Sequence, residues 1–147
     1  CADSGYDSTL RSSDDTTFPL MRGLHFIAEL YECRCAPVLL ADADALRALC
    51  LKVCAVPGLT PVGQVFHQFG SADAPAGATG AVILAESHLA VHTWPELRAV
   101  TLDLYVCNFS QDNSAAARAA CEHLLAAFAP QRVVRREIAR GEPGERG

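Results

Sequence analysis

The pattern of apolar and polar positions along the chain predicts six β-strands. Each is a short run rich in apolar and β-branched residues, or an alternation of apolar and polar residues, both typical of strands. The strands are expected at residues 24–30, 62–69, 81–85, 89–93, 100–106 and 132–138. Gly and Pro residues interrupt the pattern between positions 70 and 80, so this segment is predicted to be a loop.

Two further segments carry apolar residues three and four positions apart, the spacing of an amphipathic helix. Asp42 or Asp44 can cap the first helix, and Pro57-Gly58 stops it. The second helix is expected over residues 114–128, with Asp112 or Asn113 as its cap. The apolar positions are Leu46, Leu49, Cys50, Val53 and Cys54 in the first helix, and Ala117, Cys121, Leu124, Leu125 and Phe128 in the second.

This order of elements predicts an α+β fold, a two-layer sandwich of a mostly antiparallel sheet with both helices on one face. Two helices cannot cover both faces of a six-stranded sheet. The bare face then needs another cover, and a second copy of the chain is the simplest candidate. We therefore expect a homodimer.

The 147 residues fit one domain, which we expect at residues 21–140. Residues 1–20 are rich in Ser, Thr and Asp without apolar periodicity. They are predicted to be a disordered leader or an artificial extension before a start at Met21. Residues 141–147 contain Gly and Pro and are expected to form a flexible tail.

Charge and cysteine content narrow the class of protein. The net charge of −5 argues against nucleic-acid binding, which needs basic patches, and is compatible with a cationic small-molecule substrate. No apolar run approaches the ~18–20 residues of a membrane span, so no membrane partner is expected. Seven cysteines, an odd number without a disulfide-framework spacing, favour the reducing cytoplasm. Six of them are expected to be small buried apolar residues.

Candidate chemistry is concentrated in residues 86–96, which read ESHLAVHTWPE between two predicted strands. These eleven residues hold a candidate hydroxyl nucleophile, Ser87, together with two imidazoles, an indole and two carboxylates. Functional side chains at this density, set between rigid elements, are typical of an active site.

The E-S-H-x-x-x-H-T-W-P-E string resembles the self-cleavage segment of the bacterial and archaeal S-adenosylmethionine decarboxylases. The resemblance includes Thr79-Gly80 and Cys107 and, more weakly, residues 23–31 and 66–69, so it covers about residues 21–140. It implies a pyruvoyl-dependent enzyme that converts S-adenosylmethionine to decarboxylated S-adenosylmethionine for spermidine biosynthesis. It also implies a homodimer whose active site borrows residues across the interface.

The resemblance implies that the chain is cut between Glu86 and Ser87. The Ser87 hydroxyl would attack the Glu86 carbonyl, and elimination would leave a dehydroalanine that hydrolyses to a pyruvoyl group. That group is the cofactor, and it would bind the substrate amine as a Schiff base. By the same resemblance, His92 is the base for this processing, and Thr79, where the family more often has Ser, supports it.

Cys107 is implied to donate the proton that replaces the lost carboxylate. It alternates with Leu104 and Val106 along its predicted strand, which puts it on the more polar face. Phe69, Trp94 and Glu96 are the implied substrate-binding residues. Aromatic faces stack on a base and attract a sulfonium cation, and a carboxylate accepts hydrogen bonds from two hydroxyls.

In an extended chain His92, Trp94 and Glu96 would point to one face, although Pro95 interrupts the strand pattern. An extended chain would also separate His88 and His92 by roughly 13 Å. One metal ion cannot bridge that distance, so no metal site is expected.

Three alternatives remain open at this stage. The substrate could be arginine or ornithine, as in related pyruvoyl enzymes. The chain could be a regulatory paralogue without catalysis, although Ser87, His92 and Cys107 are all present. Phe69 and Trp94 could also be plain core residues.

Overall fold

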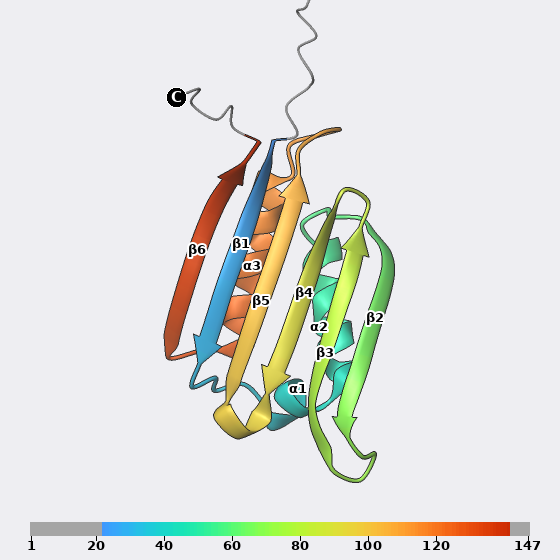
Figure 1. The fold of residues 1–147 in the computed structure, drawn as a ribbon, viewed down its shortest axis with the longest axis vertical. Helices are drawn as coiled ribbons and strands as arrows, with labels where there is room; N and C mark the ends of the chain where they lie inside the picture. The colour runs from blue at the N-terminus through green and yellow to red at the C-terminus, as the bar shows by residue number, and fades with distance from the viewer. Residues whose placement is uncertain (1–21, 142–147) are drawn as a thin grey trace, which may run out of the picture.

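The structure, a computed structural model, describes residues 22–141. The predicted leader at 1–20, and the predicted tail beyond Gly141, lie outside the described residues. Within them, six strands form one antiparallel sheet in the order β2-β3-β4-β5-β1-β6 (Figure 1). The strands are β1 Gly23–Tyr31, β2 Pro61–Gly70, β3 Pro75–Leu84, β4 Ser87–Trp94, β5 Ala99–Cys107 and β6 Arg132–Arg140.

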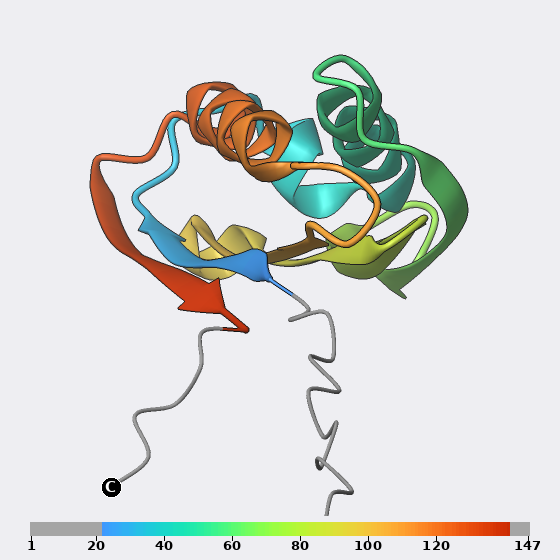
Figure 2. The ribbon, with the colours of Figure 1, turned by 90° about the horizontal axis from the view of Figure 1, so that it is seen from above.

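All helices lie on the same face of the sheet (Figure 2). They are α1 Pro37–Ala41, α2 Ala43–Ala55 and α3 Ser114–Phe128, with a 3-10 turn, η1 Pro95–Leu97, between β4 and β5. The predicted α+β two-layer sandwich with helices on one face is therefore confirmed.

The core lies between the sheet and the two long helices. In β1, the alternate residues Leu24 to Leu30 face the helices, and so do Val100 to Val106 of the paired β5. They meet the apolar stripes predicted for α2 and α3, whose fully buried members are Leu46, Cys50, Cys54, Ala117, Leu124 and Phe128. Period-2 alternation in the strands and helical spacing in the helices thus bury one common surface.

The starts of the helices follow the predicted chemistry in part. Asp42 caps α2, because its side chain accepts a hydrogen bond from the Ala45 N–H at 2.8 Å. At α3 the N-cap position is Asn113, yet Asp112 Oδ1 accepts the Ser114 N–H at 2.9 Å. The short α1 was not predicted from the sequence. Pro37 begins it, a position where a missing N–H costs nothing.

The loop predicted at residues 70–80 is wrong. Strand β3 begins at Pro75 and pairs with β2 on one side and β4 on the other. Gly77 adopts φ +109°, which only glycine tolerates well, and Gly80 leaves room for the Phe66 ring. These glycines are therefore parts of a strand held by neighbours on both sides, and their breaking tendency is overridden.

The second face of the sheet, here named the open face, carries no helix among residues 22–141 (Figure 2). Its large apolar side chains are well exposed, with Val65 at 73%, Ile83 at 48% and Ile138 at 43%. A helix long and apolar enough to cross a membrane is absent from the same part of the chain. The predicted bare sheet face is therefore present among the described residues.

Candidate active site

Ser87 lies at the start of β4, directly after the two-residue turn that joins β3 to β4. Its Oγ accepts a hydrogen bond from the Cys107 N–H at 3.1 Å. The carboxylate of Glu86, in the turn, accepts one from the Ser110 N–H at 3.3 Å. Both flanks of the 86–87 peptide bond are therefore held by the end of β5 and the segment that follows it.

Asn113 lies at the same end of the sheet as Ser87 and Cys107. It is a buried polar residue whose Nδ2 donates to the Cys107 carbonyl at 2.9 Å, while its N–H donates to Asn108 Oδ1 at 2.8 Å. Together with Glu86, Ser87 and Ser110 it lines a cavity of about 180 Å³. We name Glu86, Ser87, Cys107, Ser110 and Asn113 the Ser87 group.

Thr79 and His92 are direct partners in the β3–β4 pairing and share the open face. A hydrogen bond of 2.5 Å joins Thr79 Oγ1 to His92 Nδ1. The His92 ring lies 6.2 Å from the Trp94 indole, centroid to centroid. The hydroxyl thus fixes the imidazole on one side, and its Nε2 remains available for other contacts.

Phe69 and Glu96 complete this second set of residues. They line one hollow of about 360 Å³ with Thr79, His92 and Trp94. We name these five residues the His92 group. Glu96 was expected to continue the extended strand of His92 and Trp94. It does not, because β4 ends at Trp94 and Pro95 begins η1. Since Phe69 is 46% and Trp94 37% exposed, the alternative that both are core residues is wrong for the single chain.

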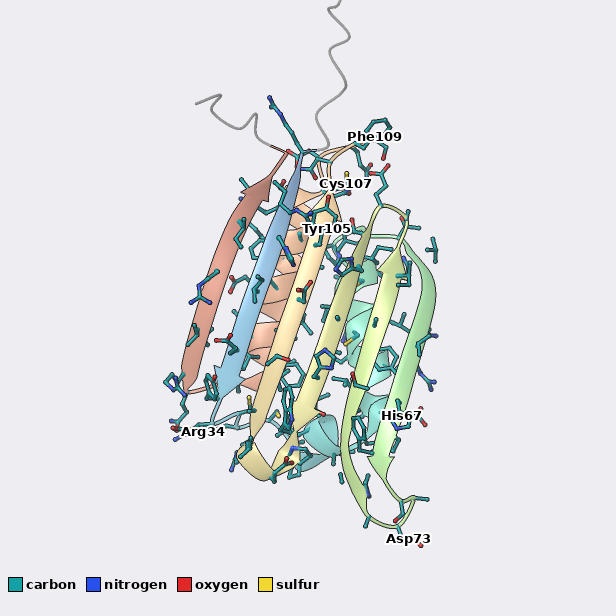
Figure 3. All side chains as sticks on the ribbon, viewed as in Figure 1. Arg34, His67, Asp73, Tyr105, Cys107 and Phe109 are labelled. Carbon is teal, nitrogen blue, oxygen red and sulfur yellow. The ribbon has the colours of Figure 1, made fainter. Side chains whose placement is uncertain are left out.

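The two groups lie at opposite ends of the sheet. Ser87 begins β4 and faces the helix side with Leu89, whereas His92 lies five residues later on the open face. Five extended residues span roughly 16 Å. Cys107 and Tyr105 mark one end of the molecule in Figure 3, and His67, the partner of Thr79, lies toward the other. A single chain therefore does not bring Ser87 and His92 together.

A third polar cluster occupies the open face beside Cys107. Asp103 Oδ1 is within hydrogen-bond distance of His25 Nε2 at 2.9 Å and of His88 Nε2 at 3.2 Å. The Tyr105 ring lies 5.8 Å from the His25 ring and 5.7 Å from the His88 ring. This cluster was not predicted from the sequence. Its signal was the alternation of polar and apolar residues along three adjacent strands, which was used only to place Cys107.

The prediction of buried cysteines is confirmed in part for the described residues, because Cys35 is only half-buried and Cys107, the expected exception, is buried as well. Cys33, Cys50, Cys54 and Cys121 are buried free thiols, and burial raises the pKa of each. For Cys33 and Cys54 the pKa is raised to about 11. Such thiols are poor acids near neutral pH and serve as apolar filling. Cys1 lies outside the described residues.

Within residues 22–141 no cluster of three or more His, Cys, Asp and Glu side chains has a geometry that could hold a metal ion. His88 and His92 stand four residues apart on the extended β4 strand, which separates their imidazoles along its length.

The candidate chemistry of this α+β sandwich thus consists of a serine directly after a tight turn and an aromatic and acidic hollow on the sheet. The sequence profile described as "S-adenosylmethionine decarboxylase" matches residues 24–141. The chain belongs to this family, which confirms the family resemblance of residues 86–96.

Relatives and solved structures agree. The S-adenosylmethionine decarboxylase proenzyme of Hydrogenobaculum sp. is 36% identical over 119 residues, covering 81% of each chain. That of Archaeoglobus fulgidus is 42% identical over 85 residues, covering 58% of this chain and 70% of the relative. The crystal structure of the adenosylmethionine decarboxylase from Aquifex aeolicus superposes with a TM-score of 0.73 at 29% identity, covering 88% of this chain and 98% of that one.

Proposed function

We propose that this protein cuts its own chain between Glu86 and Ser87 and then decarboxylates S-adenosylmethionine. The observation that carries the proposal is the turn that holds Ser87 Oγ against the Cys107 amide, on a chain of this family. The relatives' names, which describe proenzymes, support a self-processing step. The product would be decarboxylated S-adenosylmethionine, an aminopropyl donor for spermidine synthesis.

Self-cleavage follows from the placement of Ser87. Its Oγ attacks the carbonyl carbon of Glu86, the peptide C–N bond breaks, and an ester forms while the Ser87 nitrogen becomes a free amine. A base then removes the proton from the Ser87 α-carbon, and the ester oxygen leaves with the Glu86 acyl group as the new C-terminal carboxylate of the upstream fragment. Water then replaces the amine nitrogen, which is released as ammonia. The downstream chain therefore begins with a pyruvoyl carbonyl.

His92 is the base we assign to the elimination step. With its Nδ1–H donating to Thr79 Oγ1, the free Nε2 lone pair would accept the α-proton. Thr79 thereby keeps the function of a serine hydroxyl, while its methyl group restricts rotation of the side chain. The 2.5 Å contact supports a role for Thr79 in orienting the imidazole.

A homodimer resolves the separation of the two groups. In a two-fold dimer formed through the open faces, with the axis across the strands, the Ser87 end of one chain lies over the His92 end of its partner. Packed sheets lie about 10 Å apart, closer than the roughly 16 Å that separates Ser87 from His92 along one strand. The exposed apolar residues Val65 and Ile83 of the open face support this interface. We propose that each active site combines the Ser87 group of one chain with the partner's His92 group.

Substrate binding is assigned to the hollow of the His92 group. Phe69 and Trp94 offer two exposed aromatic faces for the adenine ring, and they attract the positive sulfonium of S-adenosylmethionine. The Glu96 carboxylate would accept hydrogen bonds from the two ribose hydroxyls.

The pyruvoyl group supplies a carbonyl that binds the substrate amine and accepts the electron pair released with carbon dioxide. The chain fits such a group at position 87, because Ser87 is the residue that follows the turn and the Cys107 amide fixes its oxygen. Cys107 lies beside it and would protonate the α-carbon of the substrate.

The compartment is also a proposal. The six cysteines among the described residues are all free thiols. This is expected in a reducing cytoplasm.

Mass spectrometry of the purified protein tests the processing step. We expect one fragment that ends at Glu86 and one that begins with a pyruvoyl group. Ser87→Ala should remain a single chain, because no hydroxyl can attack the Glu86 carbonyl. Ser71→Ala, in the exposed turn between β2 and β3, is the matched control and should be cut like the wild type.

Release of carbon dioxide from three carboxyl-labelled substrates tests the reaction. Turnover of S-adenosylmethionine by the cut protein is the expected result. Turnover of arginine or ornithine alone would reject the substrate assignment and keep the pyruvoyl mechanism. An intact chain without turnover would favour the regulatory paralogue, and an intact chain with turnover would reject self-processing.

A further inference from the structure

Tyr105 lies close to Cys107 along β5. The two residues are two positions apart, so they share the open face (Figure 3). The Tyr105 hydroxyl lies 3.2 Å from the point that a Cβ atom of Gly23, the cross-strand partner of Cys107, would occupy, so it reaches the end of β5 at which Cys107 lies. The processing and substrate residues assigned above do not include this tyrosine.

The neighbouring strands hold the Tyr105 ring in a fixed position. Gly23 is the direct partner of Cys107 in β1, and a Cβ atom there would lie only 2.9 Å from the Tyr105 ring and 3.2 Å from its hydroxyl. The missing side chain at Gly23 therefore leaves the space that the ring occupies. Any larger residue at this position would clash with the ring and with the Val106 carbonyl oxygen, which lies 2.5 Å from the added Cβ atom.

Charged and titratable groups surround the same ring. The Arg140 guanidinium of β6 lies 4.4 Å from the ring centroid, and the centroids of the His25 and His88 imidazoles lie 5.8 Å and 5.7 Å from it. Asp103 in turn fixes both imidazoles. The groups that face the Tyr105–Cys107 pair from the packed strands are thus His25 on β1, His88 on β4, Asp103 on β5 and Arg140 on β6.

The phenol keeps its proton in this environment. Burial raises the pKa of Tyr105, and the neighbouring Cys107 raises it further, against the opposing effect of Arg140. A neutral phenol remains a hydrogen-bond donor across the working pH range. It can donate to the sulfur both before and after the thiol loses its proton.

We propose that Tyr105 is a positioning residue for proton donation by Cys107, with its hydroxyl donating a hydrogen bond to the sulfur. This inference rests on the proposed decarboxylase function. When Cys107 gives its proton to the substrate carbon, the hydroxyl stabilises the thiolate that forms and keeps it aimed at that carbon. The neighbouring strands support the ring, because Gly23, His25, His88 and Arg140 lie around it.

Loss of this hydroxyl would alter the fate of the proton. Protonation at the substrate carbon, followed by hydrolysis, gives the amine product and returns the pyruvoyl carbonyl. Protonation at the pyruvoyl-derived carbon, followed by hydrolysis, gives an aldehyde and leaves an amine, so position 87 becomes alanine. Each route uses one proton and one water, and the two differ only in the carbon that is protonated.

Tyr105→Phe is the test variant, since it keeps the ring contacts and removes the hydroxyl alone. Self-cleavage and KM should stay unchanged, kcat should fall about tenfold, and the ratio of alanine to pyruvoyl at position 87 after a fixed number of turnovers should rise by a similar factor. Tyr31→Phe is the matched control, because Tyr31 also carries an arginine over its ring, at 3.8 Å, at the other end of β1. It should leave that ratio unchanged.

A second measurement needs no substrate. Alkylation of Cys107 at one fixed pH, followed by mass spectrometry of its peptide, should become about tenfold slower in Tyr105→Phe, because the thiolate loses its donor. This measurement stands even if S-adenosylmethionine is not the substrate. An alanine ratio and an alkylation rate that both equal the wild type would overturn the proposal. A higher KM for Tyr105→Phe, without a change in the alanine ratio or in the alkylation of Cys107, would assign Tyr105 a purely structural role. That result would also overturn the proposal.

Discussion

Single residues of the candidate site differ in how far the sequence could define them. Ser87, His92 and Cys107 were identified by a motif in which residue type and spacing are fixed together. The partners that hold them come from distant positions: Ser87 Oγ is bound by an amide twenty residues later, and His92 by a hydroxyl thirteen residues earlier. Such contacts depend on strand register, which the motif does not encode.

Tyr105 shows the same limit. Its place on the polar face followed from alternation with Leu104 and Val106, but its position near Cys107 depends on the absent side chain of Gly23 on another strand. Sequence spacing gives the face of a residue, and neighbouring strands decide what that residue contacts.

Glu96 gives a prediction at this scale. Glu96→Gln should lower kcat/KM for S-adenosylmethionine by about tenfold to a hundredfold, because a charged hydrogen bond to the ribose contributes ~1.5–3 kcal/mol. Self-cleavage should be intact, since Glu96 lies in the hollow of the His92 group and outside the Thr79–His92 contact. Steady-state kinetics and mass spectrometry measure the two effects. Glu32→Gln, on an exposed carboxylate, is the control, and an equal kcat/KM for both variants would reject the ribose assignment.

Most helices and strands were predictable because their apolar periodicity matched the surface they bury. The second helix was predicted with the observed bounds, and all six strands were found. The exception was the first half of β3, where Pro75, Gly77 and Gly80 have the composition of a loop. Pairing with β2 and β4 on both sides overrides this local tendency, and a single sequence does not reveal such tertiary support.

Thr93 secures the β3–β4 pair near the His92 group. It is buried, and its Oγ1 accepts the Ala78 N–H at 2.9 Å, just past the last backbone-paired position, Thr79↔His92. The side chain therefore continues the pairing where the strand ladder ends.

Thr93→Val should lower the free energy of unfolding by about 1–3 kcal/mol, because the similar shape fills the site but leaves the Ala78 N–H unpaired. Urea unfolding followed by circular dichroism measures this change. Thr60→Val, an exposed threonine before β2, should change the free energy of unfolding by less than about 0.5 kcal/mol. An equal stability of the two variants would show that the Thr93 contact carries no stability.

The whole molecule explains why the motif is split between two ends of one sheet. Helices cover one face, and the open face presents exposed apolar residues together with the His92 group. The sequence predicted a bare face from the number of helices, and so a second subunit. It did not predict that Ser87 and His92 would face opposite sides of β4, which follows from their odd spacing of five.

A site shared between two chains makes a specific prediction about mixed dimers. In a dimer of Ser87→Ala with His92→Ala, one site joins the intact Ser87 of the second variant to the intact His92 of the first. The other site lacks both residues. Neither variant alone can build a complete site, because each homodimer lacks the same residue twice.

The most direct test is to express His92→Ala, marked by a mass tag, together with Ser87→Ala. Our account predicts that the tagged chain is cut between Glu86 and Ser87 only in this mixture, and that the mixture releases carbon dioxide from S-adenosylmethionine. Co-expression of His92→Ala with the double variant Ser87→Ala/His92→Ala is the control and should yield no cut chain. Cleavage of His92→Ala expressed alone, at the wild-type rate, or its absence from a verified mixed dimer, would contradict a site built from two chains.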